Sequence, residues 1–347
     1  MTYFKQLDGL RFIAVVLTLI AHWFPAVGWP MIPYSWNGVD LFFAISGFLI
    51  TTILLEEKTT SIHSKWIIYK NFAARRFLRL FPLYYLFLIA FFLLYKFGHL
   101  QLGNPDAYPY LFTYTANFFY HLSPFDINSN PPDGIFNHLW SLGVEEQFYI
   151  IWPIIVLFTP TKRLPVIFSV IIIFSLFIVS FPAELSWVYV PFKSFSQLAS
   201  GAILAYLLTN QQIQLLNKKR YSIFIFLLVL YLVIIIFYPN SQSFELVRES
   251  VLLLLCFSIL LNTVFEWKGV SRFFESPTVK HLGRISYGIY LIHMPIPAIV
   301  NLIERKIHID IPPLFEISLY FCISIILANL SFKYIETPFL NLKSHFK

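Results

Sequence analysis

The chain has 347 residues, of which 58% are hydrophobic and only 12% are charged, and its mean hydropathy is +0.69. This composition excludes a soluble multi-domain protein, because apolar runs of about 17 to 25 residues, long enough to cross hydrocarbon as helices, recur along the whole chain. The basic residues behind the net charge of +7 lie in short loops between these runs, so the charge indicates membrane topology and does not indicate nucleic-acid binding.

We predict an all-α membrane protein with about ten transmembrane helices, both termini in the cytoplasm and a single membrane domain over residues 1–347. The first apolar run begins near Leu10 and no small-residue cleavage motif follows it, so we expect it to remain as the first membrane helix. Cys256 and Cys322 lie inside apolar runs, which argues against a disulfide framework and a thiolate metal site. The predicted spans are residues 10–29, 37–55, 77–97, 139–158, 165–181, 190–208, 221–238, 249–265, 283–303 and 314–334.

The basic residues set the predicted topology. With ten spans and a cytoplasmic N-terminus, all but five of the 25 lysines and arginines fall on the inner side. A further span at 108–121 would place the later basic loops outside, so we predict that residues 98–138 form an extracytoplasmic loop, with either an interfacial or a re-entrant segment left open. The five basic residues on the outer side are Lys96, Lys193, Arg248, Arg305 and Lys306.

Two polar residues of the first span share a helix face. Arg11 and His22 are eleven residues apart, which is about three turns and roughly 16 Å along the axis. By itself, a histidine in the membrane fits a structural role as well as a functional one, and an arginine at the rim fits a snorkelling anchor. Because Asp8 and Thr18 continue the same stripe, the shared face favours function.

Charged residues also open the second and third spans. Asp40 either caps its helix or orients and charges His22. Arg76 and Arg79 are neighbours on one face at the cytoplasmic boundary, directly after Arg75. Guanidinium groups suit phosphate, although topology anchoring and contact with anionic lipid explain the arginines equally well at this point.

Adjacent carboxylates enter the fourth span. Glu145 and Glu146 are costly in a membrane helix, which favours a functional purpose. Neighbouring side chains point about 100° apart, so two jobs are expected: Glu145 shares a face with Ser141 and Tyr149, whereas Glu146 is placed to brace a neighbouring helix.

Two later spans carry polar stripes, one of Lys193, Gln197 and Ser200, the other of Ser286, Tyr290 and His293. Polar contacts between helices explain both stripes as well as catalysis does. We find no glycine-rich phosphate loop, zinc-ligand spacing or nucleophile-elbow pattern, and no matched pair of broken helices of the kind found in transporters.

Taken together, these segments resemble the integral-membrane acyltransferase-3 family, whose members O-acylate cell-envelope glycans. The match covers nearly the whole chain in the right order, and it departs from the family at Gln197, where a glutamate is usual. The residues that carry it are Leu7 to Arg11 with His22, Gly38 to Phe43 with Ser46 to Phe48, Arg76 to Arg79 with Pro82, Trp140 to Leu142 with Glu145 to Tyr149, Ser286 and Tyr287 through His293, and Glu336 to Phe339.

The resemblance implies a ten-helix acyltransferase of the inner (cytoplasmic) membrane. Such an enzyme moves an acyl group, usually acetyl, from cytoplasmic acyl-CoA to a carbohydrate hydroxyl at or beyond the outer face, with acyl-CoA as co-substrate and no tightly bound cofactor or metal. Because the sequence ends soon after the last predicted span, we expect the protein to act alone or to hand its product to another protein.

The residue patterns and the resemblance together suggest roles for the site residues. We expect His22 to be the general base, with its tautomer fixed by Asp40 or Glu145, and a covalent acyl-histidine remains an open alternative. We assign Glu146 to the same catalytic group. We assign donor binding to Arg11, Arg75, Arg76 and Arg79, and acceptor binding to Trp140, Ser141, Tyr149 and His293.

Two rival interpretations remain open. A transporter or flippase of a lipid-linked sugar would use the same intramembrane charges as a substrate path. An enzyme that passes succinyl or another acyl group would bind its donor in the same way, because the arginines fit any CoA thioester.

Overall fold

The computed structural model describes residues 4–30, 37–98, 105–122, 135–179, 186–238 and 244–346, and all regular elements in these ranges are helical. The prediction of an all-α protein is therefore confirmed. Within these ranges, eight helices are long and apolar enough to cross a membrane, and a bent helix pair makes nine. The remaining predicted span, 190–208, is also helical and lies in α8 (Ser186–Thr209). Which side of the membrane the termini face stays a prediction.

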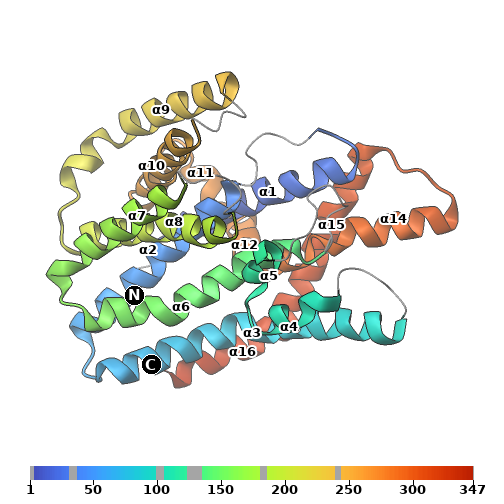
Figure 1. Ribbon diagram of the computed structural model, residues 1–347, viewed down its shortest axis with the longest axis horizontal. Coiled ribbons are helices and arrows are strands. Elements are labelled where there is room, and N and C mark those ends of the chain that lie inside the picture. Colours follow the sequence, from blue (N-terminus) through green and yellow to red (C-terminus); the bar gives the residue numbers. More distant parts are fainter. Residues whose placement is uncertain are drawn as a thin grey trace. The chain divides into compact units, whose positions relative to one another are not determined.

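The chain divides into two compact units, each assembled from three separate stretches of sequence. The first unit comprises Met1–Ala14, Trp36–Tyr69 and Ile151–Gly283, and the second comprises Val15–Ser35, Lys70–Ile150 and Arg284–Lys347. Four helices contribute residues to both units: α1 (Leu7–Ala26), α3 (Lys65–Gly98), α6 (Trp140–Phe158) and, by its last residue alone, α12 (Pro277–Arg284). Figure 1 colours the helices in sequence order, from blue at the N-terminus to red at the C-terminus.

Two helices of the first unit, α2 (Asn37–Thr60) and α8, approach each other closely, because the residues at their crossing include glycines, which have no side chain. A Cβ atom on Gly47 would lie 1.9 Å from the carbonyl oxygen of Leu198, and one on Gly201 would lie 2.0 Å from that of Ala44. Such close approach increases van der Waals contact, which is the main force that holds helices together in lipid. The helices of this unit, besides its parts of α1, α3 and α6, are α2 (Asn37–Thr60), η3 (Thr161–Arg163), α7 (Leu164–Val179), α8, α9 (Gln214–Phe237), α10 (Glu245–Val264), α11 (Ser271–Phe274) and α12 (Pro277–Arg284). Within the unit, α2 packs against α8, and α9 against α10 (Figure 1).

Short helices and one broken helix characterise the second unit. Its further elements are η1 (Pro105–Ala107), α4 (Tyr108–Phe112), α5 (Ala116–Leu122), η2 (Asn137–Leu139), α13 (Ser286–Ile292), α14 (Pro295–Ile307), α15 (Pro313–Ser331), a π-helical turn (Phe332–Glu336), α16 (Thr337–Asn341) and η7 (Leu342–His345). The helices α13 and α14 fall in the predicted span 283–303, and their axes are bent by 49° at the break between them. Pro295 and Pro297 lie in the first turn of α14, directly after this break.

The segment 108–121 forms α4 and α5, neither of which has the length of a span. Neighbouring helices hold its backbone: Tyr84 donates a hydrogen bond to the Leu111 carbonyl at 2.8 Å, and Gln147 donates one to the Tyr114 carbonyl at 3.0 Å. The side of the membrane on which it lies stays a prediction. Residues 99–104 and 123–134 of the predicted loop lie outside the described residues.

Candidate functional site

Three histidines from distant parts of the sequence meet inside the second unit. His22 comes from α1, His138 from η2, and His293 from the break between α13 and α14. The ring centroids of His22 and His293 are 5.0 Å apart, and those of His138 and His293 are 4.8 Å apart. His293 and His138 are buried, and His22 is half-buried. We call these three residues the histidine cluster.

The prolines at the break create the hydrogen-bond acceptors that this cluster uses. In a continuous helix the carbonyls of Leu291 and His293 would accept bonds from residues 295 and 297, but both are prolines and have no N–H group. Each released carbonyl receives a side chain instead. The His138 Nε2 atom lies 3.1 Å from the Leu291 oxygen, and Trp23 donates its indole N–H to the His293 oxygen at 3.1 Å.

These contacts fix which nitrogen of each neutral imidazole carries the proton, because a carbonyl oxygen only accepts. His138 therefore donates from Nε2, so its Nδ1 keeps a lone pair. His293 donates from Nδ1 to the Tyr290 carbonyl, so the lone pair is on its Nε2. That Nε2 atom is 3.1 Å from the Nδ1 atom of His22, which is also 3.0 Å from the Thr18 carbonyl. His22 thus shares one N–H between two acceptors.

These contacts also determine the state of Nε2, the other nitrogen of the His22 ring. With its proton on Nδ1, His22 carries an unprotonated Nε2, the form that a general base requires. From the sequence we predict that Asp40 or Glu145 orients this ring. In the structure, His22 Nδ1 forms hydrogen bonds with the Thr18 carbonyl oxygen and with His293 Nε2. A role of Asp40 or Glu145 toward His22 stays a prediction.

Two hydroxyl groups hold the backbone at His138. Ser141 and Tyr290 each donate a hydrogen bond to the His138 carbonyl at 3.0 Å, and their hydroxyls contact each other. Ser141 therefore lies beside the histidine cluster, to which His293 itself belongs, and both residues were predicted to bind the acceptor. Trp140 begins α6 one residue before Ser141, where it is partly buried.

The three arginines Arg75, Arg76 and Arg79, predicted to bind the donor, lie on the part of α3 that belongs to the second unit. The Arg76 guanidinium lies 5.4 Å from the centre of the Phe72 ring and 5.3 Å from that of the Tyr149 ring, distances typical of cation–π contacts. The charges of Glu145 and Glu146 also act on Arg76. Tyr149, predicted from its face with Glu145, thus contacts an arginine.

The chain's C-terminal residues add to this charged region. Arg75 donates a hydrogen bond to the Phe346 carbonyl at 2.7 Å. Lys343 follows the π-helical turn in the sequence, and the charges of Arg75, Arg76 and Arg79 act on it. Within this unit, Glu336 interacts with Arg79 and Lys343. Sequence reasoning missed Lys343, because no motif distinguishes it from other basic residues of a terminus.

Arg11 and Asp40 belong to the first unit. Arg11 pairs with Asp8 at 3.5 Å. Asp40 is buried near the start of α2, where the charges of Lys193 and Glu249 act on it. Lys193 and Glu249 form an ion pair of 2.7 Å that joins α8 to α10.

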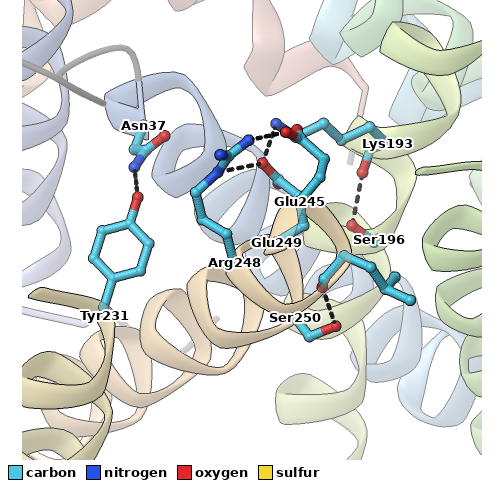
Figure 2. A network of polar contacts seen from close by, with 9 residues as sticks. Asn37, Lys193, Ser196, Tyr231, Glu245, Arg248, Glu249 and Ser250 are labelled. Atoms are coloured by element: carbon cyan, nitrogen blue, oxygen red, sulfur yellow. Dashed lines mark hydrogen bonds and ion pairs between the residues drawn. The ribbon is translucent and has the colours of Figure 1, made fainter. Parts of the chain in front are cut away.

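Figure 2 shows the polar network around this ion pair. Arg248 pairs with Glu245 one turn earlier in α10, and its Nε atom is 3.9 Å from Glu249. Asn37, at the start of α2, contacts the hydroxyl of Tyr231 in α9. Lys193 and Arg248 thus interact with two carboxylates, those of Glu245 and Glu249. These contacts support a structural role in the first unit for the polar stripe that contains Lys193.

Sequence reasoning also missed His138 as a site residue. It stands two residues before Trp140, which was the available signal, but its partner Leu291 is 153 residues away. Among the described residues, no three side chains of His, Cys, Asp and Glu are placed to hold a metal ion together.

Comparison with known proteins gives one family and several relatives. A family model described as an acyltransferase domain matches residues 4–331. The peptidoglycan O-acetyltransferase OatA of Listeria monocytogenes is 30% identical over 97% of this chain and 56% of its own length. A putative O-acetyltransferase of Staphylococcus aureus is 32% identical over 98% of this chain and 58% of its own length.

A putative peptidoglycan O-acetyltransferase of Bacillus subtilis is 29% identical over 97% of this chain and 55% of its own length. The chain therefore spans little more than half the length of these relatives. No solved structure matches it significantly.

Proposed function

Because the chain belongs to the acyltransferase domain family, we propose that it is a membrane-embedded O-acetyltransferase that moves an acetyl group from cytoplasmic acetyl-CoA to a hydroxyl of a cell-wall glycan. The names of two relatives support the acceptor class: a peptidoglycan O-acetyltransferase of Listeria monocytogenes and a putative one of Bacillus subtilis. The observation that carries the proposal is the unprotonated Nε2 atom of His22, held in that form by His293 and Thr18.

The proposed reaction needs a base because an alcohol has a pKa far above neutrality. His22 Nε2 takes the hydroxyl proton while the oxygen attacks the thioester carbonyl, which forms the ester and releases the CoA thiolate. The imidazolium then returns its proton to the sulfur, so the products are the acetylated glycan and CoA thiol. His293 stabilises the transient imidazolium, because its Nε2 lone pair accepts the Nδ1 proton.

We assign donor binding to the arginines of α3. The donor carries phosphates, and guanidinium groups bind phosphate through paired N–H donors. Arg75, Arg76 and Arg79 occupy one stretch of one helix in the second unit, and the charge of Lys343 adds to theirs. We keep Arg11 as a further donor-binding residue, and we place the protein in the cytoplasmic membrane, where acetyl-CoA is available on one side.

Analysis of the cell-wall glycans tests the proposed function directly. Cell-wall glycans from cells with and without the gene are digested to fragments and compared by mass spectrometry. We expect fragments heavier by one acetyl unit only where the gene is present, and their fragmentation identifies the sugar that carries the ester. A succinyl difference would change the donor, and identical fragment spectra from both strains would overturn the proposed function.

A further inference from the structure

One nitrogen in the histidine cluster has no role in the reaction described above. The His138 ring is 2% exposed, and its Nδ1 atom has no hydrogen-bond partner among the described residues. A buried polar atom left unpaired is costly because it loses its hydrogen bond to water, so such atoms are rare and call for an explanation.

The chemistry of this nitrogen restricts what can bind there. His138 donates from Nε2 to the Leu291 carbonyl, and Pro295 frees that carbonyl permanently, so Nδ1 is held as an acceptor. A ligand must therefore offer a hydrogen-bond donor. The thioester carbonyl and the phosphates of an acyl-CoA are acceptors, and its pantetheine arm has only isolated amide N–H and hydroxyl donors, whereas a sugar presents several hydroxyl donors on adjacent carbons.

The position of the ring points to the same ligand. His22 and His138 both pack against the ring of His293, with centroid distances of 5.0 Å and 4.8 Å. Two imidazole lone pairs, on His22 Nε2 and His138 Nδ1, thus belong to one cluster. One of them serves the reacting hydroxyl, and the other is available to a second donor group of the same molecule.

We propose that His138 Nδ1 binds the acceptor carbohydrate by accepting a hydrogen bond from a hydroxyl next to the one that is acetylated. This inference rests on the proposed function and adds to it a residue that recognises the acceptor. It also assigns a purpose to Pro295, since the Leu291 carbonyl that this proline frees sets the tautomer of His138.

Two substitutions separate recognition from structure. In His138→Gln the side-chain amide nitrogen replaces Nε2, which keeps the bond to Leu291 but removes the acceptor at Nδ1. In His138→Asn the amide oxygen replaces Nδ1, which keeps the acceptor but removes the bond to Leu291. Membranes that contain each full-length variant are assayed with radiolabelled acetyl-CoA and soluble peptidoglycan fragments, and the KM of each substrate is measured separately, along with thermal stability.

For His138→Gln we expect the KM of the peptidoglycan fragments to rise about tenfold, the loss of one hydrogen bond to substrate, with the KM of acetyl-CoA and the stability unchanged. For His138→Asn we expect an acceptor KM within about twofold of wild type and a lower stability. An unchanged acceptor KM in His138→Gln would overturn the inference and indicate bound water only. A rise in the acetyl-CoA KM alone would also overturn it. Absence of transfer by wild-type membranes would instead overturn the proposed function itself.

Discussion

His22 and His293 share one hydrogen bond, and its direction decides which nitrogen of His22 is left unprotonated. His293 Nδ1 points at the Tyr290 carbonyl, so His293 accepts through Nε2 and His22 donates through Nδ1. In many hydrolases a carboxylate has this orienting role. A neutral imidazole performs it here without placing a second charge beside His22, which suits a site of low dielectric constant.

Arg76 illustrates how a cation is kept inside a membrane protein. Its guanidinium lies near the rings of Phe72 and Tyr149, and the charges of Glu145 and Glu146 compensate it. Such contacts stabilise a guanidinium group in a medium of low dielectric constant. A lysine would supply the charge without the planar donor fork.

We expect the variant Arg76→Lys with Arg79→Lys to raise the KM of acetyl-CoA about tenfold, with the KM of the acceptor unchanged, because two donor forks to phosphate are lost. Initial rates of label transfer at varied acetyl-CoA measure this. The matched control is Lys70→Arg on the same helix, which should leave both values unchanged. If the double variant lost stability but kept its donor KM, the arginines would be anchors and not a donor site.

At the scale of the elements, the break between α13 and α14 organises the site. Pro295 and Pro297 interrupt the helix, bend it by 49°, and release the two carbonyls to which His138 and Trp23 bind. Irregular backbone at membrane depth is tolerated only where protein or a cavity satisfies its polar groups. The side chains of η2 and α1 satisfy them here.

The variant Pro295→Ala with Pro297→Ala restores both N–H groups, which then compete for the carbonyls of Leu291 and His293. We expect acetyl transfer to fall at least about tenfold, while thermal stability in detergent is kept or rises because a helix regains two hydrogen bonds. Label transfer and circular dichroism measure the two effects. Pro313→Ala at the first turn of α15 is the control, since no helical bond changes there. Full activity in the double variant would show that the break does not organise the site.

Most elements could be predicted because apolar runs alone determine a membrane helix. The errors lie at the ends: the predicted span 77–97 is the apolar part of α3, which begins at Lys65 because a basic stretch of about three turns continues the helix. The short helices α4 and α5 could not be placed from the sequence, since bonds from Tyr84 and Gln147 hold them and no local pattern records those partners.

At the scale of the whole molecule, the composition predicts a membrane protein, but it does not predict which helices belong to which unit. Each unit combines three separate stretches of sequence, and the periodicity of a helix contains no information on which helix it contacts. The candidate site shows the same limit. The spacing of Arg11 and His22 predicts a functional stripe, but the pairing of His22 with His293 joins residues 271 positions apart.

Turnover by the His22→Ala variant tests the central claim most directly. The wild-type protein, His22→Ala and His293→Ala are purified, placed in proteoliposomes, and assayed for transfer of label from acetyl-CoA to peptidoglycan fragments, with the exposed His63→Ala as control. We predict that His22→Ala abolishes transfer, that His293→Ala slows it about 10- to 100-fold because the ring it orients is released, and that His63→Ala matches wild type. Wild-type turnover by a correctly folded His22→Ala protein would contradict the account.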